Sequence, residues 1–411
     1  MNKNLYFLFF TIFIDMLGIG ILIPVVPQLL GEPNSLYYLL SPDQKDLGYI
    51  LLGLLMTSYP LALFFASPIL GALSDKYGRK PILVISIIGT ALSYFVFAYA
   101  IFTKNIVLLF ISRIVDGATG GNISVAQAAV ADLTSPEDRA KTFGMVGAVF
   151  GLGFIMGPFL GGVLSSSAVN PFFNAATPFI FSGFLSLVNA ISIAYFFRES
   201  IKEKFKDNKV RFFASLENIV KAQKFQNVRF LFLVSFLFTT GFAFFTSFFN
   251  VYLTDKFNFT PVNVGNFFGY VGVWIILVQI FVVRNIPPRF TENVLLGPAY
   301  ILSGIGVLLL LVPDNSWYLF LIVPLASIPH GIQHANYISL LTKTTDETMR
   351  GEVLGVNASV SSLAQSLPPV FAGLLAAAFT AYVPILMAAL LVMLAGVVFI
   401  FKVKKQNEQF Q

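Results

Sequence analysis

The 411-residue sequence contains no cysteine, only two histidines and few charged residues. Without cysteine, a disulfide, a thiolate metal site and a cysteine nucleophile are all excluded. Aspartate, glutamate, lysine and arginine make up 11% of the chain, against about 25% in ordinary soluble domains, whereas 56% of the residues are apolar. Because so few charges cannot cover a surface that faces water, the composition excludes a soluble globule and predicts an integral membrane protein.

Long unbroken apolar runs recur along the whole chain. A helix needs about 20 apolar residues to cross the hydrocarbon layer, whereas the strands of a membrane barrel alternate over about 10 residues. The sequence therefore predicts an all-α integral membrane protein with twelve transmembrane helices. The predicted spans are 5–30, 48–70, 82–102, 106–130, 143–165, 177–197, 230–253, 264–283, 293–312, 317–341, 352–377 and 382–401.

Lysine and arginine are distributed unevenly between the loops. With both termini in the cytoplasm, all but four of the 26 basic residues fall in cytoplasmic segments. Lys45, Lys104 and Lys256 lie in outside loops, and Arg113 lies inside a span. By the positive-inside rule, this pattern predicts a multi-pass protein of the plasma (inner) membrane with both termini cytoplasmic. The same pattern accounts for the net charge of +6, so no nucleic-acid partner is predicted.

A polar stretch divides the chain into two halves of six spans. We predict an N-terminal six-helix bundle at residues 1–197, a cytoplasmic linker at 198–229 and a C-terminal six-helix bundle at 230–411. Apolar residues at helical spacing within 212–224 predict a surface helix in the linker, which either tethers the halves or regulates the protein.

The two halves also show weak internal similarity. Two parallel six-span repeats are typical of transporters whose halves rock around a central site. A shift of 211 residues places Arg139, Gly144, Pro158, Gly162 and Leu164 on Arg350, Gly355, Pro369, Gly373 and Leu375.

The loop between spans 2 and 3 carries the sequence GALSDKYGRKP at 71–81, which fits the pattern G-x-L-x-D-x-x-G-R-K. Glycines allow close backbone approach and a tight turn, and Asp75 can meet a cation or a helix N-terminus. The alternative is a generic basic loop that only obeys topology. The motif resembles that of the major facilitator superfamily, in which this loop stabilises the outward-open state. The resemblance implies a cytoplasmic gate at Gly71, Asp75, Gly78 and Arg79.

Span 5 contains a string of small residues, GFIMGPFLGG at 153–162. Such residues let a second helix pack closely, and a proline can kink the helix. Close packing alone is one interpretation. The string is also similar to the signature of the superfamily's antiporters, mostly drug exporters, which implies export. The residues of this motif are Gly153, Gly157, Pro158, Gly161 and Gly162.

Asp15 lies in the first span. A carboxylate at that depth costs about 2.5 to 3.5 kcal/mol on insertion scales, so it is expected to face a cavity or a partner and to load and release a proton. The alternative is that Asp15 only joins two helices by hydrogen bonds. The surrounding residues 13–27 resemble the first span of the tetracycline/proton exporters.

Arg113 and Asp116 lie three residues apart in span 4, on one face of a helix, and can neutralise each other. They form either a static pair or one that exchanges partners with the proton state. The tetracycline exporters do not place an acid at the position of Asp116, so Asp116 is a second candidate proton site. We predict that Asp15, Arg113 and Asp116 couple proton movement to transport.

The two histidines lie four residues apart in span 10, on one helical face. They either make hydrogen bonds in the core or bind a substrate or proton. No metal site is predicted, since the segment offers no third ligand. The candidate substrate cavity contains His330, Gln333, His334, Asn336 and Gln365.

The sequence contains no Walker loop, nucleotide fingerprint or catalytic triad, so we predict neither an enzyme nor an ATP-driven pump, and no cofactor. The resemblance implies a monomeric, proton-coupled antiporter that exports small amphipathic molecules, multidrug or tetracycline-like, by alternating access. Its partners are then its small-molecule substrate, protons and the lipid bilayer. The alternative is a symporter or facilitator that imports a nutrient such as a sugar or an amino acid.

Overall fold

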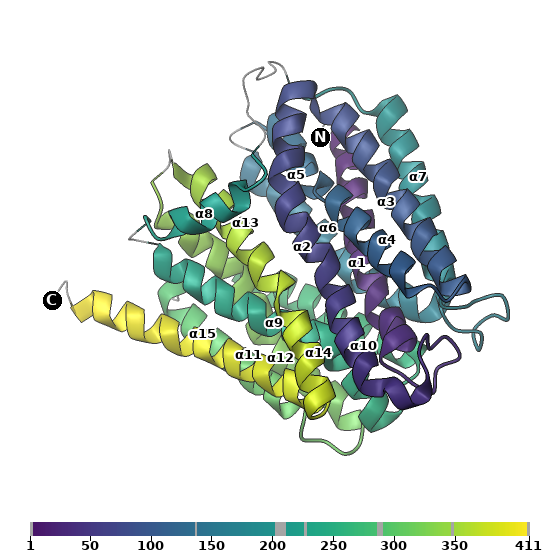
Figure 1. Ribbon diagram of the computed structural model, residues 1–411. Helices are drawn as coiled ribbons and strands as arrows, with labels where there is room; N and C mark the ends of the chain where they lie inside the picture. Colours follow the sequence, from purple (N-terminus) through teal and green to yellow (C-terminus); the bar gives the residue numbers. More distant parts are fainter. Residues whose placement is uncertain are drawn as a thin grey trace. The chain divides into compact units, whose positions relative to one another are not determined.

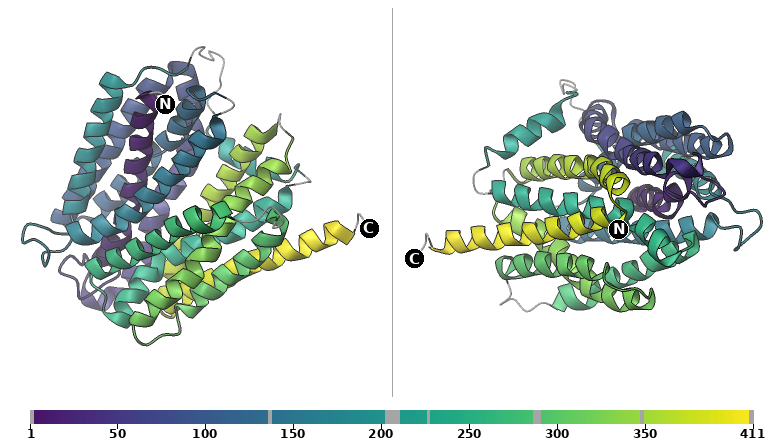
Figure 2. Two further views of the ribbon diagram at one scale, coloured as in Figure 1. Left: turned by 180° about the vertical axis from the view of Figure 1, so that it is seen from behind. Right: turned by 60° about the horizontal axis from the view of Figure 1, so that its bottom comes forward.

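A computed structural model describes residues 3–135, 138–201, 211–225, 228–285, 291–346 and 349–408. These residues form helices joined by loops, without a strand among them (Figures 1 and 2). Within the described ranges, eleven helical segments are long and apolar enough to cross a membrane. The 27-residue helix α12 occupies the predicted tenth span, so every predicted span is helical. The all-α membrane fold predicted from composition is confirmed.

The helices follow the predicted spans in order. In the first half, they are α1 (Lys3–Leu30), α2 (Lys45–Tyr77), α3 (Arg79–Phe102), α4 (Ile106–Thr119), α5 (Asn122–Asp132), α6 (Arg139–Leu164) and α7 (Thr177–Phe196). After the linker helix α8 (Ala214–Ala222) come α9 (Arg229–Phe257), α10 (Pro261–Leu277), α11 (Glu292–Leu309), α12 (Trp317–Lys343), α13 (Arg350–Ser366), α14 (Pro368–Ala378) and α15 (Tyr382–Glu408). The short helical segments are the 3₁₀ helices η1 (Pro42–Gln44) and η3 (Val283–Asn285) and the π-helix η2 (Val278–Val282).

Two predicted spans are each made of two helices. The fourth span is divided into α4 and α5 at the glycine pair Gly120–Gly121, and the eleventh is divided into α13 and α14 at Leu367. Pro368 begins α14, where its missing N–H and fixed φ suit the first turn of a new helix. Pro158, by contrast, lies inside α6, which continues as one helix on both sides of it.

The chain forms two compact units. Unit 1 comprises Met1–Lys45, Ser58–Ala214 and Thr260–Gly269, and unit 2 comprises Asp46–Thr57, Ser215–Phe259 and Tyr270–Gln411. The division between Ala214 and Ser215 falls inside the predicted linker 198–229. Each unit has its own apolar core, with Leu8, Ile12, Leu83 and Ile87 buried in unit 1. Leu231, Val234, Leu296, Tyr300 and Phe399 are buried in unit 2.

The two halves show matching local packing. In unit 1, a Cβ added at Gly162 would lie 3.2 Å from the Cα of Gly265, and in unit 2 a Cβ at Gly373 would lie 3.3 Å from the Cα of Gly53. The 211-residue shift equates Gly162 with Gly373. Equated glycines therefore both sit at helix crossings where backbone meets backbone, as expected for related repeats.

The predicted linker helix is present as α8, and it packs within unit 2. Asn218 Nδ2 donates to Ser359 Oγ at 3.2 Å, and Lys221 Nζ lies 3.2 Å from Glu352 Oε1, both on α13. Leu216 and Val220 stay exposed on another face of α8. The helix therefore has a polar face that contacts α13 and an apolar face that is exposed.

Candidate functional site

Six polar side chains of unit 1 form a buried group that we call the polar cluster. Electrostatic interactions connect its tyrosines to both of its carboxylates and to its arginine. The cluster draws on five helices, because its members lie on α1, α2, α3, α4 and α5. The members are Asp15, Tyr59, Tyr94, Arg113, Asp116 and Asn122.

The predicted pair of Arg113 and Asp116 is present in this cluster. Arg113 Nη1 lies 2.5 Å from Asp116 Oδ2, and the two side chains are only 6% and 5% exposed. The guanidinium of Arg113 also lies over the ring of Tyr59, 4.6 Å from its centroid. Ion pairing and the face of an aromatic ring both stabilise a cation that has lost its water. The positive charge of Arg113 is thus held by two partners from different helices.

Asp15 is buried and only half satisfied. Asn122 Nδ2 donates to Asp15 Oδ1 at 3.3 Å. Asp15 Oδ2 and Asn122 Oδ1 have no hydrogen-bond partner among the described residues. A buried carboxylate oxygen without a donor is costly, so its site suits a proton or an incoming donor. Asp15 also interacts electrostatically with Asp116, which makes the two predicted carboxylates members of one charge system.

The motif predicted as a gate folds into a network around Arg79. Arg79 Nη1 donates to Asp75 Oδ1 at 2.5 Å and to Ser74 Oγ at 2.6 Å, while its Nε donates to Asp132 Oδ2 at 3.0 Å. Arg79 is 7% exposed, so two carboxylates compensate a buried cation at this end of unit 1.

A further carboxylate holds the start of α3. Glu199 Oε1 accepts the backbone N–H of Arg79 at 2.9 Å, and its Oε2 accepts that of Lys80 at 3.2 Å. A carboxylate at a helix N-terminus satisfies free N–H groups and complements the helix dipole. Sequence reasoning missed Glu199 and Asp132, because each is far from the motif along the chain. Both are nevertheless acids at the end of an apolar run on the basic side, which is the signal that could have found them.

The two glycines of this motif differ in their roles. Gly78 has φ 110° and ψ 154°, a backbone conformation that is essentially restricted to glycine, so the predicted tight turn is present. Gly71 lies inside α2, and a Cβ added there would meet nothing within 4 Å. The close approach that we predicted at Gly71 is therefore not seen.

The small residues of span 5 lie against α1 in the same unit. A Cβ at Gly157 would be 2.6 Å from the carbonyl oxygen of Leu17 and 2.7 Å from the Cα of Gly20. At Gly161 it would be 2.8 Å from the oxygen of Ile21, and at Gly153 it would be 2.7 Å from that of Phe13. Glycines at four-residue spacing on α6 therefore bring its backbone against α1, the helix that carries Asp15.

In unit 2, the candidate substrate residues are only partly brought together. Gln333 Nε2 lies 3.2 Å from His330 Nδ1, and Gln333 is fully buried with its Oε1 unpartnered among the described residues. The ring of His330 stacks on Phe242 at 5.2 Å and lies 5.6 Å from the ring of Phe238, two aromatic neighbours that we did not predict. His330 and Gln333 thus form a small polar pair between aromatic rings of α9.

Asn336 and Gln365 do not join that pair. Asn336 Nδ2 donates to Ile332 O at 2.7 Å, within its own helix. Gln365 is exposed on α13, and the side chain of His334 lies outside the described ones. No group of three or more histidine, aspartate or glutamate side chains that could hold a metal occurs in the described part of the chain.

These observations define a class of protein. A helical membrane protein with two six-span repeats and ionic groups deep in one unit has the architecture of a secondary transporter. Residues 8–367 and 289–411 match the family model of the Major Facilitator Superfamily. The chain belongs to this superfamily, whose members are transporters and not enzymes.

Curated relatives cover nearly the whole chain. The class C tetracycline resistance protein of Escherichia coli is 29% identical over 90% of this chain and 88% of its own length. The quinolone resistance protein NorA of Staphylococcus aureus (strain COL) is 27% identical over 99% of this chain and 100% of its own. The sequence resemblance to the drug-exporting members of the superfamily is confirmed.

Solved structures share the fold. The human organic anion transporter MFSD10 (TETRAN) has a TM-score of 0.72 at 21% identity, covering 97% of this chain and 100% of that one. A bacterial homologue of the human lysosomal transporter Spinster has a TM-score of 0.74 at 15% identity, with 98% of both chains covered. The predicted fold, twelve helices in two six-helix repeats, is confirmed.

Proposed function

We propose that this protein is a proton-coupled antiporter of the plasma (inner) membrane that exports small amphipathic molecules by alternating access. It works as a monomer without a cofactor, and both of its termini lie in the cytoplasm, as the basic loops favour. The proposal is supported by relatives named for tetracycline and quinolone resistance, which align with 87% or more of the chain.

The observation that carries this proposal is Asp15 Oδ2, which has no partner among the described residues and lies in the same cluster as a closed ion pair. Arg113 and Asp116 neutralise each other, so the net charge of the cluster is set by Asp15. With Asp15 protonated, the cluster is neutral; with Asp15 ionised, it carries one uncompensated negative charge. An uncompensated charge is expensive away from water, so either a proton or a cationic group of the substrate is favoured there. Competition of the two for one charge is the requirement of exchange transport.

The gate residues can account for the change between the two access states of the transporter. The network of Asp75, Arg79 and Asp132 contains one cation and two acids, and it breaks if α2 and α5 separate at this end. We propose that it forms in one access state and opens in the other. The histidine pair of unit 2, His330 with Gln333, then contacts the substrate from the second half.

The test is transport by the purified protein in vesicles. Vesicles with the cytoplasmic face outward and an acidic lumen should accumulate ethidium or tetracycline, and a protonophore should release it. Asp15→Asn should lower this uphill uptake by at least about tenfold, because the charge no longer alternates. The matched control is Asp43→Asn, which removes an exposed acid in η1 and should change nothing.

The alternative, nutrient import, makes the opposite prediction for direction. An importer would accumulate a sugar or an amino acid in vesicles of native orientation and would ignore both drugs. Normal uphill transport by Asp15→Asn would remove Asp15 from the mechanism in either case.

A further inference from the structure

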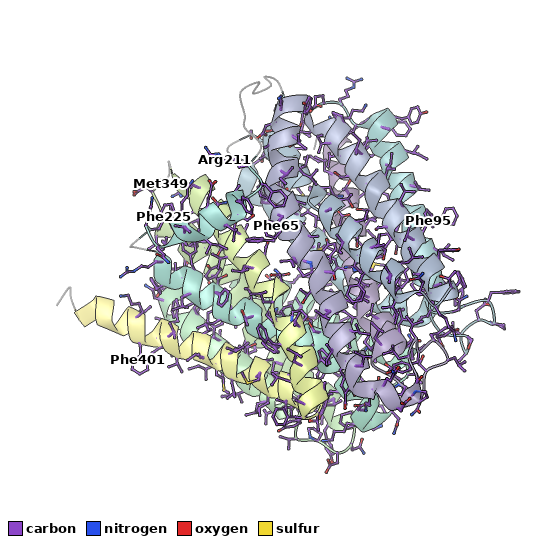
Figure 3. All side chains as sticks on the ribbon, viewed as in Figure 1. Phe65, Phe95, Arg211, Phe225, Met349 and Phe401 are labelled. Carbon is purple, nitrogen blue, oxygen red and sulfur yellow. The ribbon has the colours of Figure 1, made fainter. Side chains whose placement is uncertain are left out.

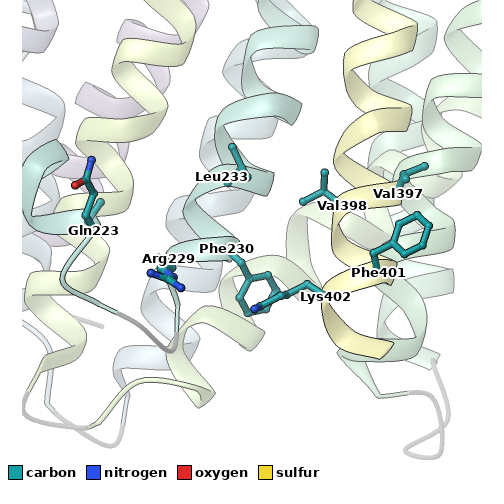
Figure 4. Close-up of a pocket in the computed structure, with 9 residues that line it drawn as sticks. Gln223, Arg229, Phe230, Leu233, Val397, Val398, Phe401 and Lys402 are labelled. Carbon is teal, nitrogen blue, oxygen red and sulfur yellow. The ribbon is translucent and has the colours of Figure 1, made fainter. Parts of the chain in front are cut away.

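Unit 2 contains a pocket that the transport site does not use. It has a volume of about 760 Å³ and lies between the beginning of α9 and the end of α15 (Figure 4). Ala222, the last residue of α8, and the following Gln223 also line it. Its volume falls within the range of about 300 to 1,000 Å³ that is typical of ligand sites. The pocket is far along the sequence from every residue of the polar cluster, and none of its lining residues belongs to the histidine pair.

The pocket has an apolar wall, and it is open on one side. Phe230, Leu233, Val397, Val398 and Phe401 line it. Leu233 is 49% exposed and Phe401 is 72% exposed. Figure 3 shows Phe401 projecting outward from α15 near the end of that helix. Exposed side chains of this kind on a membrane-spanning helix face lipid chains, so the pocket opens toward the hydrocarbon layer.

Two cations lie at one end of the same pocket. Arg229 is the first residue of α9, and Lys402 directly follows the predicted end of the twelfth span at residue 401, so both are placed where the hydrocarbon layer meets the headgroups. In Figure 4 both lie at the end of the pocket where α9 begins, and Leu233, Val397 and Val398 lie further along it. Neither cation makes an ion pair with a described residue, and the pocket has no acidic residue in its lining.

We propose that this pocket binds an anionic phospholipid. Arg229 and Lys402 hold the phosphate, and an acyl chain lies against Leu233, Val397 and Phe401. The two cations select an anionic headgroup, because a zwitterionic headgroup would bring its own positive charge next to Arg229 and Lys402. The open apolar side selects a lipid over a free phosphate ion, since phosphate alone would leave that wall uncovered. The bound lipid also touches Gln223, so it supports the attachment of the linker helix α8 to unit 2.

Native mass spectrometry of the full-length protein in a nonionic detergent tests the proposal. The protein is titrated with palmitoyl-oleoyl phosphatidylglycerol, with the phosphatidylcholine of the same chains and with inorganic phosphate. We expect retained phosphatidylglycerol and little phosphatidylcholine. Arg229→Gln with Lys402→Gln should weaken phosphatidylglycerol binding about 30-fold, since each cation contributes about a factor of five at an anionic membrane surface.

Two further variants separate charge from shape. Lys104→Gln with Lys141→Gln removes the same charge from exposed positions outside the pocket and should leave binding unchanged. Leu233→Trp fills the apolar wall without changing charge and should also weaken lipid binding by about tenfold or more, while thermal stability shows that the variant is folded. Equal binding of the two lipids, or unchanged binding in the Arg229 and Lys402 double variant, would overturn the proposal. Competition by phosphate together with an unaffected Leu233→Trp variant would overturn it as well, because the site would then bind only an anion.

Discussion

At the scale of single residues, the polar cluster is an arrangement in which each charge depends on the others. The positive charge of Arg113 is buried with one acid at 2.5 Å and one tyrosine ring, so it has no access to water as a substitute partner. Removing one member of a buried ion pair therefore leaves the other uncompensated, whereas removing both leaves only neutral groups. The pair is accordingly expected to be more sensitive to single than to double substitution.

Arg113→Gln should destabilise the protein by about 3 kcal/mol or more, because it leaves the Asp116 carboxylate buried without its cation. The double variant Arg113→Gln with Asp116→Asn should recover most of that loss. Thermal unfolding of both variants in detergent measures the difference. If the single and the double variant unfolded at the same temperature, the two side chains would not be coupled as described.

The glycines of the gate motif give a second test at this scale. Gly78→Ala should cost about 1 to 3 kcal/mol, because alanine is strained at φ 110°. Gly71→Ala is the matched control: it lies in α2 with open space around it and should be neutral or more stable by up to about 1 kcal/mol. Unfolding temperatures of the two variants check this ordering. A Gly71 variant as unstable as the Gly78 variant would contradict it.

Ionisable residues of the site could be predicted from the sequence, but their neutral partners could not. Asp15, Arg113 and Asp116 are identified because a charge within an apolar run is expensive and needs a reason. Asn122 and Tyr94 give no such signal, since asparagines and tyrosines occur at many positions in these spans. Only the fold brings Asn122 to Asp15 and brings Tyr94 within electrostatic range of both carboxylates.

At the scale of elements, the close contact of α1 and α6 positions the helix that carries Asp15. In a membrane, such contacts depend on small residues that let backbones approach, because lipid is as apolar as the side chains. The glycines of α6 that face α1 are spaced by four residues, and other glycines of the same helix, such as Gly151, have nothing within 4 Å. Helix α6 thus contains glycines that contact α1 and a glycine that does not, which can serve as a control for substitutions of the others.

Gly157→Val should weaken this contact by about 1 to 3 kcal/mol, because its side chain would collide with Leu17 and Gly20 of α1. It should also lower transport, since a displaced α1 moves Asp15. Gly151→Val makes the same change where space is open and should be tolerated. Unfolding temperature and vesicle uptake are measured together. Equal behaviour of the two variants would mean that the motif does not act through this crossing.

The existence of the helices could be predicted more fully than their interruptions. Apolar length identifies a span, but it does not report that the helix is interrupted at Gly120 and Gly121 or at Leu367. Glycine pairs and prolines also occur inside unbroken helices, as Pro158 does in α6. The difference lies in whether neighbouring helices satisfy the freed backbone groups, which is a property of the packed fold.

At the scale of the whole molecule, transport requires that proton and substrate use the same buried charge in turn. The sequence supported this idea through the number of spans, the internal repeat and the isolated acids. It could not give the substrate, because the residues that would select one are common polar and aromatic types in both halves. The central claim is therefore best tested on the proton rather than on the substrate.

The most direct measurement is proton release when substrate binds. The purified protein is held in a weakly buffered detergent solution, and the pH is followed as ethidium or tetracycline is added, whichever the vesicles accumulate. The wild type and Asp43→Asn should release protons in proportion to the substrate bound. Asp15→Asn should release no protons for whatever substrate it still binds, because residue 15 then carries no proton that the substrate can displace. Proton release by Asp15→Asn equal to that of the wild type would contradict the account.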